Sequence, residues 1–286
     1  MAGRRLLFTT LILAGLLRLG HRRTKAVTRL ALMSSCRFGL RWLSHAMPSP
    51  DGCAVVIAPH PDDETLACGA MIARRRAVGL PVHVIVVTDG SASHPNHPTL
   101  TGPVLRTVRR DEARAALAIL GVESVAVHFL DEVDGTLGHL TPERADRLVN
   151  QLRELLAAIG PTEVYLPCCP DGSSEHDATY AMTLRAIAAA QARPAVWEYP
   201  VWSWWNPWLI LGRLGEARRC WSLPTEDFGL VKSRAIACYR TQLQPSPPWL
   251  KPLVPPELVH MLSSDREYFF RVEMPSVRPA TPPRAV

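Results

Sequence analysis

The sequence predicts an α/β protein with a Rossmann-like layered fold, in which a mostly parallel sheet carries helices on both faces. Short runs rich in β-branched residues alternate with longer segments whose apolar residues recur at helical spacing. This alternation is typical of βαβ units, because parallel strands need a crossover connection. The 286 residues are enough for one large α/β domain or two smaller ones.

The expected elements follow one another in a regular order. We expect strands at 53–58, 82–88, 124–130, 163–167 and 195–200. Helices are expected at about 65–79, 104–120, 141–159 and 177–191. The third helix has the clearest limits, because Thr141 and Pro142 are typical of a helix start and Gly160-Pro161 of a helix end.

Positive charge is concentrated in the first 50 residues, which hold nine Arg and Lys and no Asp or Glu. The rest of the chain carries 23 basic and 26 acidic residues. The net charge of +6 therefore belongs to the N-terminal part, and we expect no nucleic-acid binding by the body. We predict a basic arm at 1–50, a folded domain at 51–274 and a disordered Pro- and Arg-rich tail at 275–286.

The arm has more than one interpretation. Its apolar run at 6–17 is shorter than the roughly 20 residues that span a bilayer, and no clear cleavage site for a signal peptide follows it. An amphipathic segment in peripheral contact with an anionic membrane surface fits this pattern, and so does a helix that covers the body or a loosely ordered extension. The seven Cys show no zinc-ribbon spacing, so we expect reduced thiols and a cytoplasmic, membrane-associated protein.

The most reactive stretch follows the first expected strand and reads Pro59-His60-Pro61-Asp62-Asp63-Glu64. In an open α/β sheet this position lies at the carboxyl end of a strand, where ligands bind. A second acidic loop follows the strand at 163–167 and reads Asp171-Gly172-Ser173-Ser174-Glu175-His176-Asp177. We expect the two loops to be neighbours in space.

These loops contain a set of metal-ligand types. His60 and Asp63 are three residues apart, so both can face one ion at a tight turn. With His176 they form the two-histidine, one-carboxylate set typical of catalytic zinc, whose bound water is acidified towards a pKa of about 7. Asp62 is placed to accept a proton from that water. From the first loop alone, a helix cap that needs no metal is an equally good interpretation.

The first motif resembles the signature of the LmbE-like, or PIG-L-like, zinc-dependent N-deacetylases. Thr88-Asp89-Gly90, Arg109-Arg110-Asp111-Glu112 and Glu175-His176-Asp177-Ala178-Thr179 extend this resemblance over about residues 53–245. The resemblance implies that His60, Asp63 and His176 bind Zn²⁺, that Asp62 is the general base and that Arg109 contacts a substrate hydroxyl. It also implies hydrolysis of the acetamide of an N-acetylglucosamine-type sugar, either a small molecule or a lipid-linked one.

The second motif departs from the family at one position. Members often have His-Pro-Asp-His, whereas this chain has Ser173-Ser174-Glu175-His176. Ser173 can donate a hydrogen bond to substrate but cannot be a cationic acid, and loss of such an acid costs about 10²–10⁴ in rate. His94, His97 or His139 from flanking loops, or the return of a proton by Asp62, are the candidate replacements.

Other interpretations stay open. A metal-binding protein with weak or no deacetylase activity is consistent with Ser173, whereas a metal-dependent phosphoesterase usually needs more ligands than these loops supply. A dinucleotide-binding dehydrogenase is disfavoured, because the first strand–helix turn lacks Gly-x-Gly-x-x-Gly. The Trp cluster at 197–208 fits a sugar-stacking platform, a lipid-facing patch or plain packing. Iron and other divalent ions use the same ligand types as zinc, and the sequence does not predict an oligomeric state.

Overall fold

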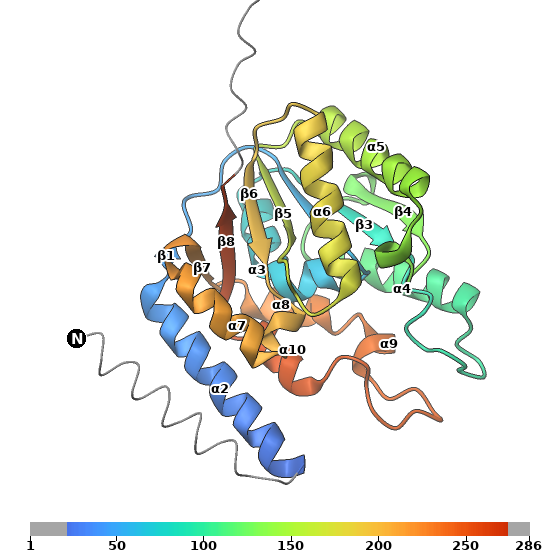
Figure 1. The fold of residues 1–286 in the computed structure, drawn as a ribbon, viewed down its shortest axis with the longest axis vertical. Coiled ribbons are helices and arrows are strands. Elements are labelled where there is room, and N and C mark those ends of the chain that lie inside the picture. Colours follow the sequence, from blue (N-terminus) through green and yellow to red (C-terminus); the bar gives the residue numbers. More distant parts are fainter. Residues whose placement is uncertain (1–21, 274–286) are drawn as a thin grey trace, which may run out of the picture.

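One eight-stranded sheet organises the chain (Figure 1). The computed structural model describes residues 22–273. The strands are β1 (His45–Ala46), β2 (Ala54–Ala58), β3 (Val82–Thr88), β4 (Val127–Glu132), β5 (Glu163–Pro167), β6 (Ala195–Tyr199), β7 (Cys220–Pro224) and β8 (Arg266–Val272). Their order is β1-β7-β8-β6-β5-β2-β3-β4, and only the pairs that contain β8 are antiparallel. The predicted mostly parallel α/β sheet is confirmed.

Helices cover both faces of this sheet (Figure 1). The α-helices of the described residues are α2 (Arg22–Leu43), α3 (Asp63–Ala77), α4 (Gly102–Ile119), α5 (Pro142–Ile159), α6 (Ser174–Ala189), α7 (Pro207–Arg213), α8 (Gly229–Ile236), α9 (Arg240–Leu243) and α10 (Pro256–Leu262). Short 3₁₀ helices are η1 (Ser124–Ala126), η2 (Leu137–His139), η3 (Trp202–Trp204) and η4 (Leu214–Arg219).

The central strand β2 shows how the layers are separated. All five of its residues are buried, as expected for a strand with parallel neighbours and helices on both faces. Val56 faces the core that contains α3 and α4, whereas Val55 and Ile57 face the core that contains α5 and α6. The alternation of side chains along a strand therefore divides the apolar core into two parts.

Helix α5 begins and ends where the sequence predicts. The Thr141 side chain accepts a hydrogen bond from the Arg144 N–H at 3.4 Å, and Pro142 occupies the first turn. Gly160 ends the helix with a φ of 61°, a conformation that glycine adopts without a steric penalty. Between these limits the helix buries Leu148, Val149, Leu152 and Leu156 against the sheet, each contributing roughly 1.5–3 kcal/mol.

The largest difference from the expected elements lies after residue 200. Strands β7 and β8 were not predicted, because they do not continue the βαβ alternation on which the other strands were recognised. They extend the sheet beyond β6, and β8 reverses direction. The strand expected at 124–130 begins at Val127 instead, after the 3₁₀ turn η1.

Half of the expected basic arm is helix α2, which packs on the body of the protein. Met33, Cys36 and Leu40 are buried in the core below it. The guanidinium groups of Arg37 and Arg41 meet the Asp265 carboxylate between α10 and β8. Residues 1–21 of the arm and the expected tail at 275–286 lie outside the described residues.

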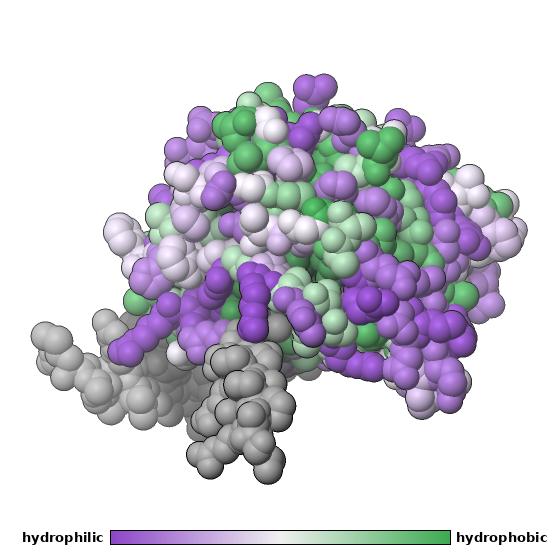
Figure 2. Space-filling view, turned by 90° about the horizontal axis from the view of Figure 1, so that it is seen from above, coloured by the Kyte–Doolittle hydropathy of each residue, from purple (hydrophilic) through white to green (hydrophobic). Residues whose placement is uncertain are grey.

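The surface seen from above mixes hydrophobic and hydrophilic residues, with a broad hydrophilic area on the right of the view (Figure 2). Within residues 22–273, no helix combines the length and the hydropathy that a membrane crossing requires.

Candidate active site

The loop between β2 and α3 holds Asp62 in a backbone conformation that few residues adopt. Its φ is 152°, a strained value that costs about 1–3 kcal/mol unless surrounding contacts maintain it. The Asp62 N–H donates to Glu64 Oε2 at 3.1 Å. Glu64 is fully buried and accepts hydrogen bonds from the hydroxyl groups of Thr65 and Tyr239. A buried network thus fixes Asp62 at the sheet edge.

His60, Asp63 and His176 converge on one point between the two loops. Asp63 Oδ2 lies 3.1 Å from His60 Nδ1 and 3.2 Å from His176 Nε2. Three atoms that bind one ion at 2.0–2.2 Å with tetrahedral geometry lie about 3.4 Å from one another. The spacing of these three side chains is therefore compatible with one metal ion held between them.

Each imidazole also faces a carboxylate on its outer side. His60 Nε2 lies 2.6 Å from Glu175 Oε2 and 3.4 Å from Asp134 Oδ1, and His176 Nδ1 lies 2.8 Å from Asp171 Oδ2. An outer carboxylate keeps the proton on the outer nitrogen and leaves the inner nitrogen free to bind a metal. His176 is fully buried, and neither of its nitrogens makes a well-directed hydrogen bond. A metal is therefore a fitting partner for its inner nitrogen.

Carboxylates outnumber imidazoles around this point, where the acidic residues are Asp63, Asp134, Asp171 and Glu175. Although burial opposes the charge on His176, Asp63 and Asp171 raise its pKa to about 9. Burial likewise opposes ionisation of Asp63, but His176 and His60 hold the pKa of that carboxyl well below its usual value. A divalent cation would neutralise the excess negative charge.

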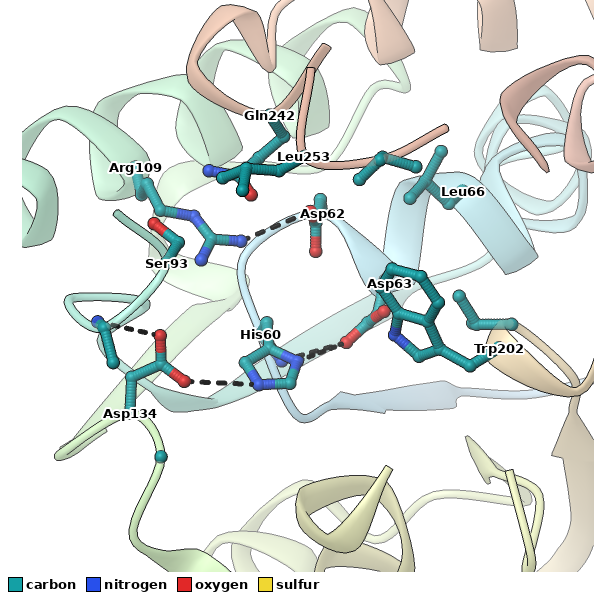
Figure 3. A pocket seen from close by; sticks show the side chains of 14 residues that line it. His60, Asp62, Asp63, Leu66, Ser93, Arg109, Asp134, Trp202, Gln242 and Leu253 are labelled. Atoms are coloured by element: carbon teal, nitrogen blue, oxygen red, sulfur yellow. Dashed lines mark hydrogen bonds and ion pairs between the residues drawn. The ribbon is translucent and has the colours of Figure 1, made fainter. Parts of the chain in front are cut away.

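Arg109 reaches the first loop from α4. Its Nη2 lies 3.2 Å from Asp62 Oδ2 (Figure 3). The same Nη2 donates to the Pro61 carbonyl at 2.9 Å, and Nη1 donates to the Gly90 carbonyl at 3.2 Å. Gly90 leaves the space for this guanidinium: its φ is +67°, and a Cβ atom there would lie 2.5 Å from Arg109 Nη1. Burial raises the pKa of Asp62 to about 7, although Arg109 opposes that shift. Arg109 thus orients Asp62.

A cavity of about 350 Å³ opens over these groups (Figure 3). Ala92 and Ser93 contribute to its wall, so the loop at 89–103 overhangs the same sheet edge as His60. The residues that line the cavity are His60, Asp62, Asp63, Leu66, Ala92, Ser93, Arg109, Asp134, Gly135, Val201, Trp202, Gln242, Leu253 and Val254.

Residues 55–187 match the protein family described as PIG-L: GlcNAc-PI de-N-acetylase. The matched segment contains both loops of the site, from His60 to His176. The chain carries a domain of the PIG-L deacetylase family. The resemblance seen in the sequence motifs is confirmed.

A curated relative of the PIG-L domain is the uncharacterized deacetylase YaiS of Escherichia coli (strain K12). It is 27% identical to this chain over 157 residues, which cover 53% of this chain and 75% of the relative.

Two solved structures share the fold of this chain. N,N′-diacetylchitobiose deacetylase from Pyrococcus horikoshii has a TM-score of 0.56 and 17% identity over 77% of this chain and 83% of that chain. GalB, the 4-carboxy-2-hydroxymuconate hydratase of Pseudomonas putida KT2440, has a TM-score of 0.54 and 21% identity over 67% of this chain and 80% of that chain. Because a deacetylase and a hydratase share this fold, the reaction must be argued from the site.

The PIG-L domain brings together most of the predicted site residues, namely His60, Asp62, Asp63, Arg109 and His176. Ser173 instead precedes α6 as its N-cap residue and is not among the residues that line the cavity. His139 is exposed in η2, and the rings of His94 and His97 pack against Trp249. Among the candidate replacements for the family's histidine, Asp62 is the one that lines the cavity.

Two further residues of the site, Asp134 and Asp171, had no role in the sequence prediction. Asp134 follows β4, so the rule that ligands gather at the carboxyl ends of strands would have found it. Asp171 accepts hydrogen bonds from the Trp202 N–H at 3.1 Å and the Ser203 N–H at 2.8 Å. It thereby joins the metal-ligand loop to Trp202, whose ring lies beside Asp63 at the cavity wall (Figure 3).

Proposed function

We propose that this protein is a zinc-dependent N-deacetylase that hydrolyses the acetamide of an N-acetylated amino sugar. The observation that carries the proposal is the convergence of His60, Asp63 and His176 below a cavity, with Asp62 beside them and outside the ligand set. Two imidazoles and one carboxylate, with one position left for water, are typical of catalytic zinc. The family of the domain supports the same chemistry.

Bound zinc would supply Lewis acidity, which polarises a carbonyl group and acidifies a water molecule. Asp62 is the general base: it accepts the proton of the attacking water, and Arg109 fixes its carboxylate for that purpose. As the C–N bond breaks, Asp62 returns the proton to the departing amine, since Ser173 cannot act as the acid. The products are a free amino sugar and acetate.

The lining of the cavity suits a sugar ring. Leu66, Trp202 and Leu253 present apolar surface, whereas Ser93 and Gln242 present hydrogen-bonding groups. A sugar has apolar faces for an aromatic ring and hydroxyl groups at its rim, so this mixture of apolar and polar side chains matches its chemistry. The Pyrococcus relative is named for an N-acetylated sugar substrate, which supports this class. We assign a substrate hydroxyl to Arg109, which lines the cavity. Ser173 lies outside that lining, so its polar contact with the substrate would be a subsidiary one.

The amino sugar is a small molecule or is linked to a lipid. The nine basic residues at 1–50 favour the lipid-linked class, reached by peripheral contact with a membrane. All seven cysteines are free, which favours the cytoplasmic side of that membrane.

A second candidate function is metal binding with weak or no deacetylation, which Ser173 favours because the family's usual acid is missing. A phosphoesterase has less support. A second metal ion would have to use Asp134 and Glu175, and this set is complete only with His60, which already belongs to the first set. Arg109, the single cation among the described residues of the cavity wall, is already paired with Asp62.

Acetate release from a panel of soluble and lipid-linked N-acetyl sugars tests the proposal. We expect release by the zinc-loaded protein and no release after chelation or in the Asp62→Ala variant. The Ser173→His variant separates the two candidate functions, because restoring an acid should raise the rate of a deacetylase. No release from any substrate by either the native protein or Ser173→His, with zinc bound, would support the metal-binding function instead.

A further inference from the structure

Helix α2 exposes an apolar stripe along its outer face. Val27, Ala31, Phe38 and Trp42 follow one another at intervals that place them on one side of a helix, and we call these four residues the α2 stripe. Phe38 and Trp42 are 66% and 73% exposed, and Val27 is 66% exposed. Their two aromatic rings contact each other edge to face, with centroids 6.3 Å apart. The opposite side of the helix is the one that packs on the body.

The chemistry around the α2 stripe is cationic. Helix α2 contains six Arg and Lys and no Asp or Glu, and residues 1–21 before it add an apolar run flanked by more arginines. The ion pairs of Arg37 and Arg41 with Asp265 hold the helix at a fixed angle to the body, with the stripe outward. Exposed aromatic rings on an arginine-rich helix suit a membrane surface, where an anionic headgroup layer covers an apolar interior.

The α2 stripe is also connected to the active site. Trp202 lines the cavity, and three residues later Trp205 lies under the guanidinium of Arg29 on α2, 4.6 Å from the ring centroid. Between them, Trp204 is buried beneath Arg37 of the same helix. One turn of 3₁₀ helix, η3, therefore joins the wall of the cavity to the helix that bears the stripe.

We propose that the α2 stripe seats this protein on an anionic phospholipid bilayer, so that the cavity meets amino sugars whose lipid tails stay in the membrane. The aromatic rings of Phe38 and Trp42 enter the headgroup region, and the excess positive charge of residues 1–50 attracts the anionic lipids. The membrane contact stands on the exposed stripe and its charge alone, whereas the lipid-linked substrate rests on the proposed deacetylase function.

Co-sedimentation of the full chain with vesicles tests the surface without any substrate. The vesicles are phosphatidylcholine with and without phosphatidylglycerol. We expect binding only to the anionic vesicles, and the variant Phe38→Ser/Trp42→Ser should lower the partition coefficient about tenfold or more, because it removes two buried aromatic rings from the bound state. The matched control is Val125→Ser, since Val125 is 80% exposed at the opposite edge of the sheet and should leave partitioning unchanged.

Thermal melting and the mass in solution complete the test. Both aromatic side chains are exposed, so we expect an unchanged melting temperature in the double variant. Unchanged partitioning of that variant would overturn the proposal by assigning any membrane contact to residues 1–21. A lower melting temperature or a lost dimer, with unchanged partitioning, would overturn it by showing that residues 1–21 or a second copy cover the stripe. Acetate release from a soluble N-acetyl sugar is measured separately. Release by a protein whose double variant still partitions unchanged would mean that the membrane proposal has failed and the deacetylase function has not.

Discussion

Three features determine the role of Asp62: its strained backbone conformation, the neighbouring guanidinium of Arg109 and its place in the cavity wall. Its strained φ is maintained by Glu64, and its carboxylate is oriented by Arg109. A general base contributes about 10²–10⁴ to the rate when it is well placed. We therefore expect Asp62→Asn to lower kcat by about 10³ while one zinc per chain is retained. Stoichiometry by metal analysis is the control, since loss of zinc in this variant would mean that Asp62 is a ligand instead.

Gly90 determines whether Arg109 can reach Asp62. A methyl group at this position would lie 2.5 Å from Arg109 Nη1 and 2.8 Å from its Cζ, so Gly90→Ala should push the guanidinium away. We expect kcat/KM to fall about 10- to 100-fold, as misplacement of a positioning group does.

Gly79→Ala is the matched control for this variant. Gly79 has a φ of +77°, close to the +67° of Gly90, but nothing lies within 4 Å of its Cβ position. Both variants should lose about 1 kcal/mol of stability from the positive φ. Equal kinetic losses in the two variants would show that strain, and not the displacement of Arg109, causes the effect.

At the scale of elements, two loops meet above the cavity. His94 stacks on Trp249 at 5.1 Å, and His97 Nε2 lies 3.2 Å from the Ser246 carbonyl oxygen. Ser93 from the first loop and Leu253 from the second line the cavity, so this contact fixes the distance between two of its walls.

Trp249→Ala should therefore raise KM about tenfold and change kcat by less than about threefold, because Trp249 packs on His94 and His97 and does not line the cavity. Steady-state kinetics on a soluble N-acetyl sugar provides the measurement. Leu250→Ala is the control, since Leu250 is 85% exposed on the same loop. If kcat of Trp249→Ala fell by as large a factor as KM rises, the contact between the loops would act in the chemical step.

The elements that could be predicted from sequence share one property: their signal is local. The capping residues of α5 and the apolar run of β2 are readable within one segment. Strand β8 is not, because its place depends on antiparallel pairing with β6 and β7 on both sides. The same distinction applies to the site. The two motifs supply the proposed metal ligands, whereas Asp134 and Trp202 become site residues only because the sheet brings further loops to one edge.

At the scale of the whole molecule, the buried histidines couple metal binding to stability. His176 has a pKa raised from 6.5 to about 9. In chelated protein its protonated ring stabilises the fold fully below pH 6.5, and this contribution of up to about 3 kcal/mol is lost as the pH rises to about 9. The depressed pKa of Asp63 acts in the opposite direction, since its contribution is lost in acid.

We expect the melting temperature of chelated protein to fall between pH 6.5 and 9. The stabilisation by added zinc should grow over the same range, because metal binding requires neutral imidazoles. Calorimetry with and without chelator measures both trends. A flat pH profile for the chelated protein, equal to that of His176→Gln, would contradict the assigned charge state of this ring.

The carboxylate of Asp171 contacts both the metal site and the wall of the cavity, so it can couple the binding of an ion to the binding of a sugar. One side of it faces His176, and the other holds the main chain at Trp202 and Ser203. Any ordering of this carboxylate by an occupied metal site also orders the aromatic wall, so the affinities for ion and sugar are thermodynamically linked. By reciprocity, a sugar that binds more tightly to the metal-loaded protein must strengthen binding of the ion by the same free energy. Under the proposed function, bound substrate would therefore help this protein to retain its metal.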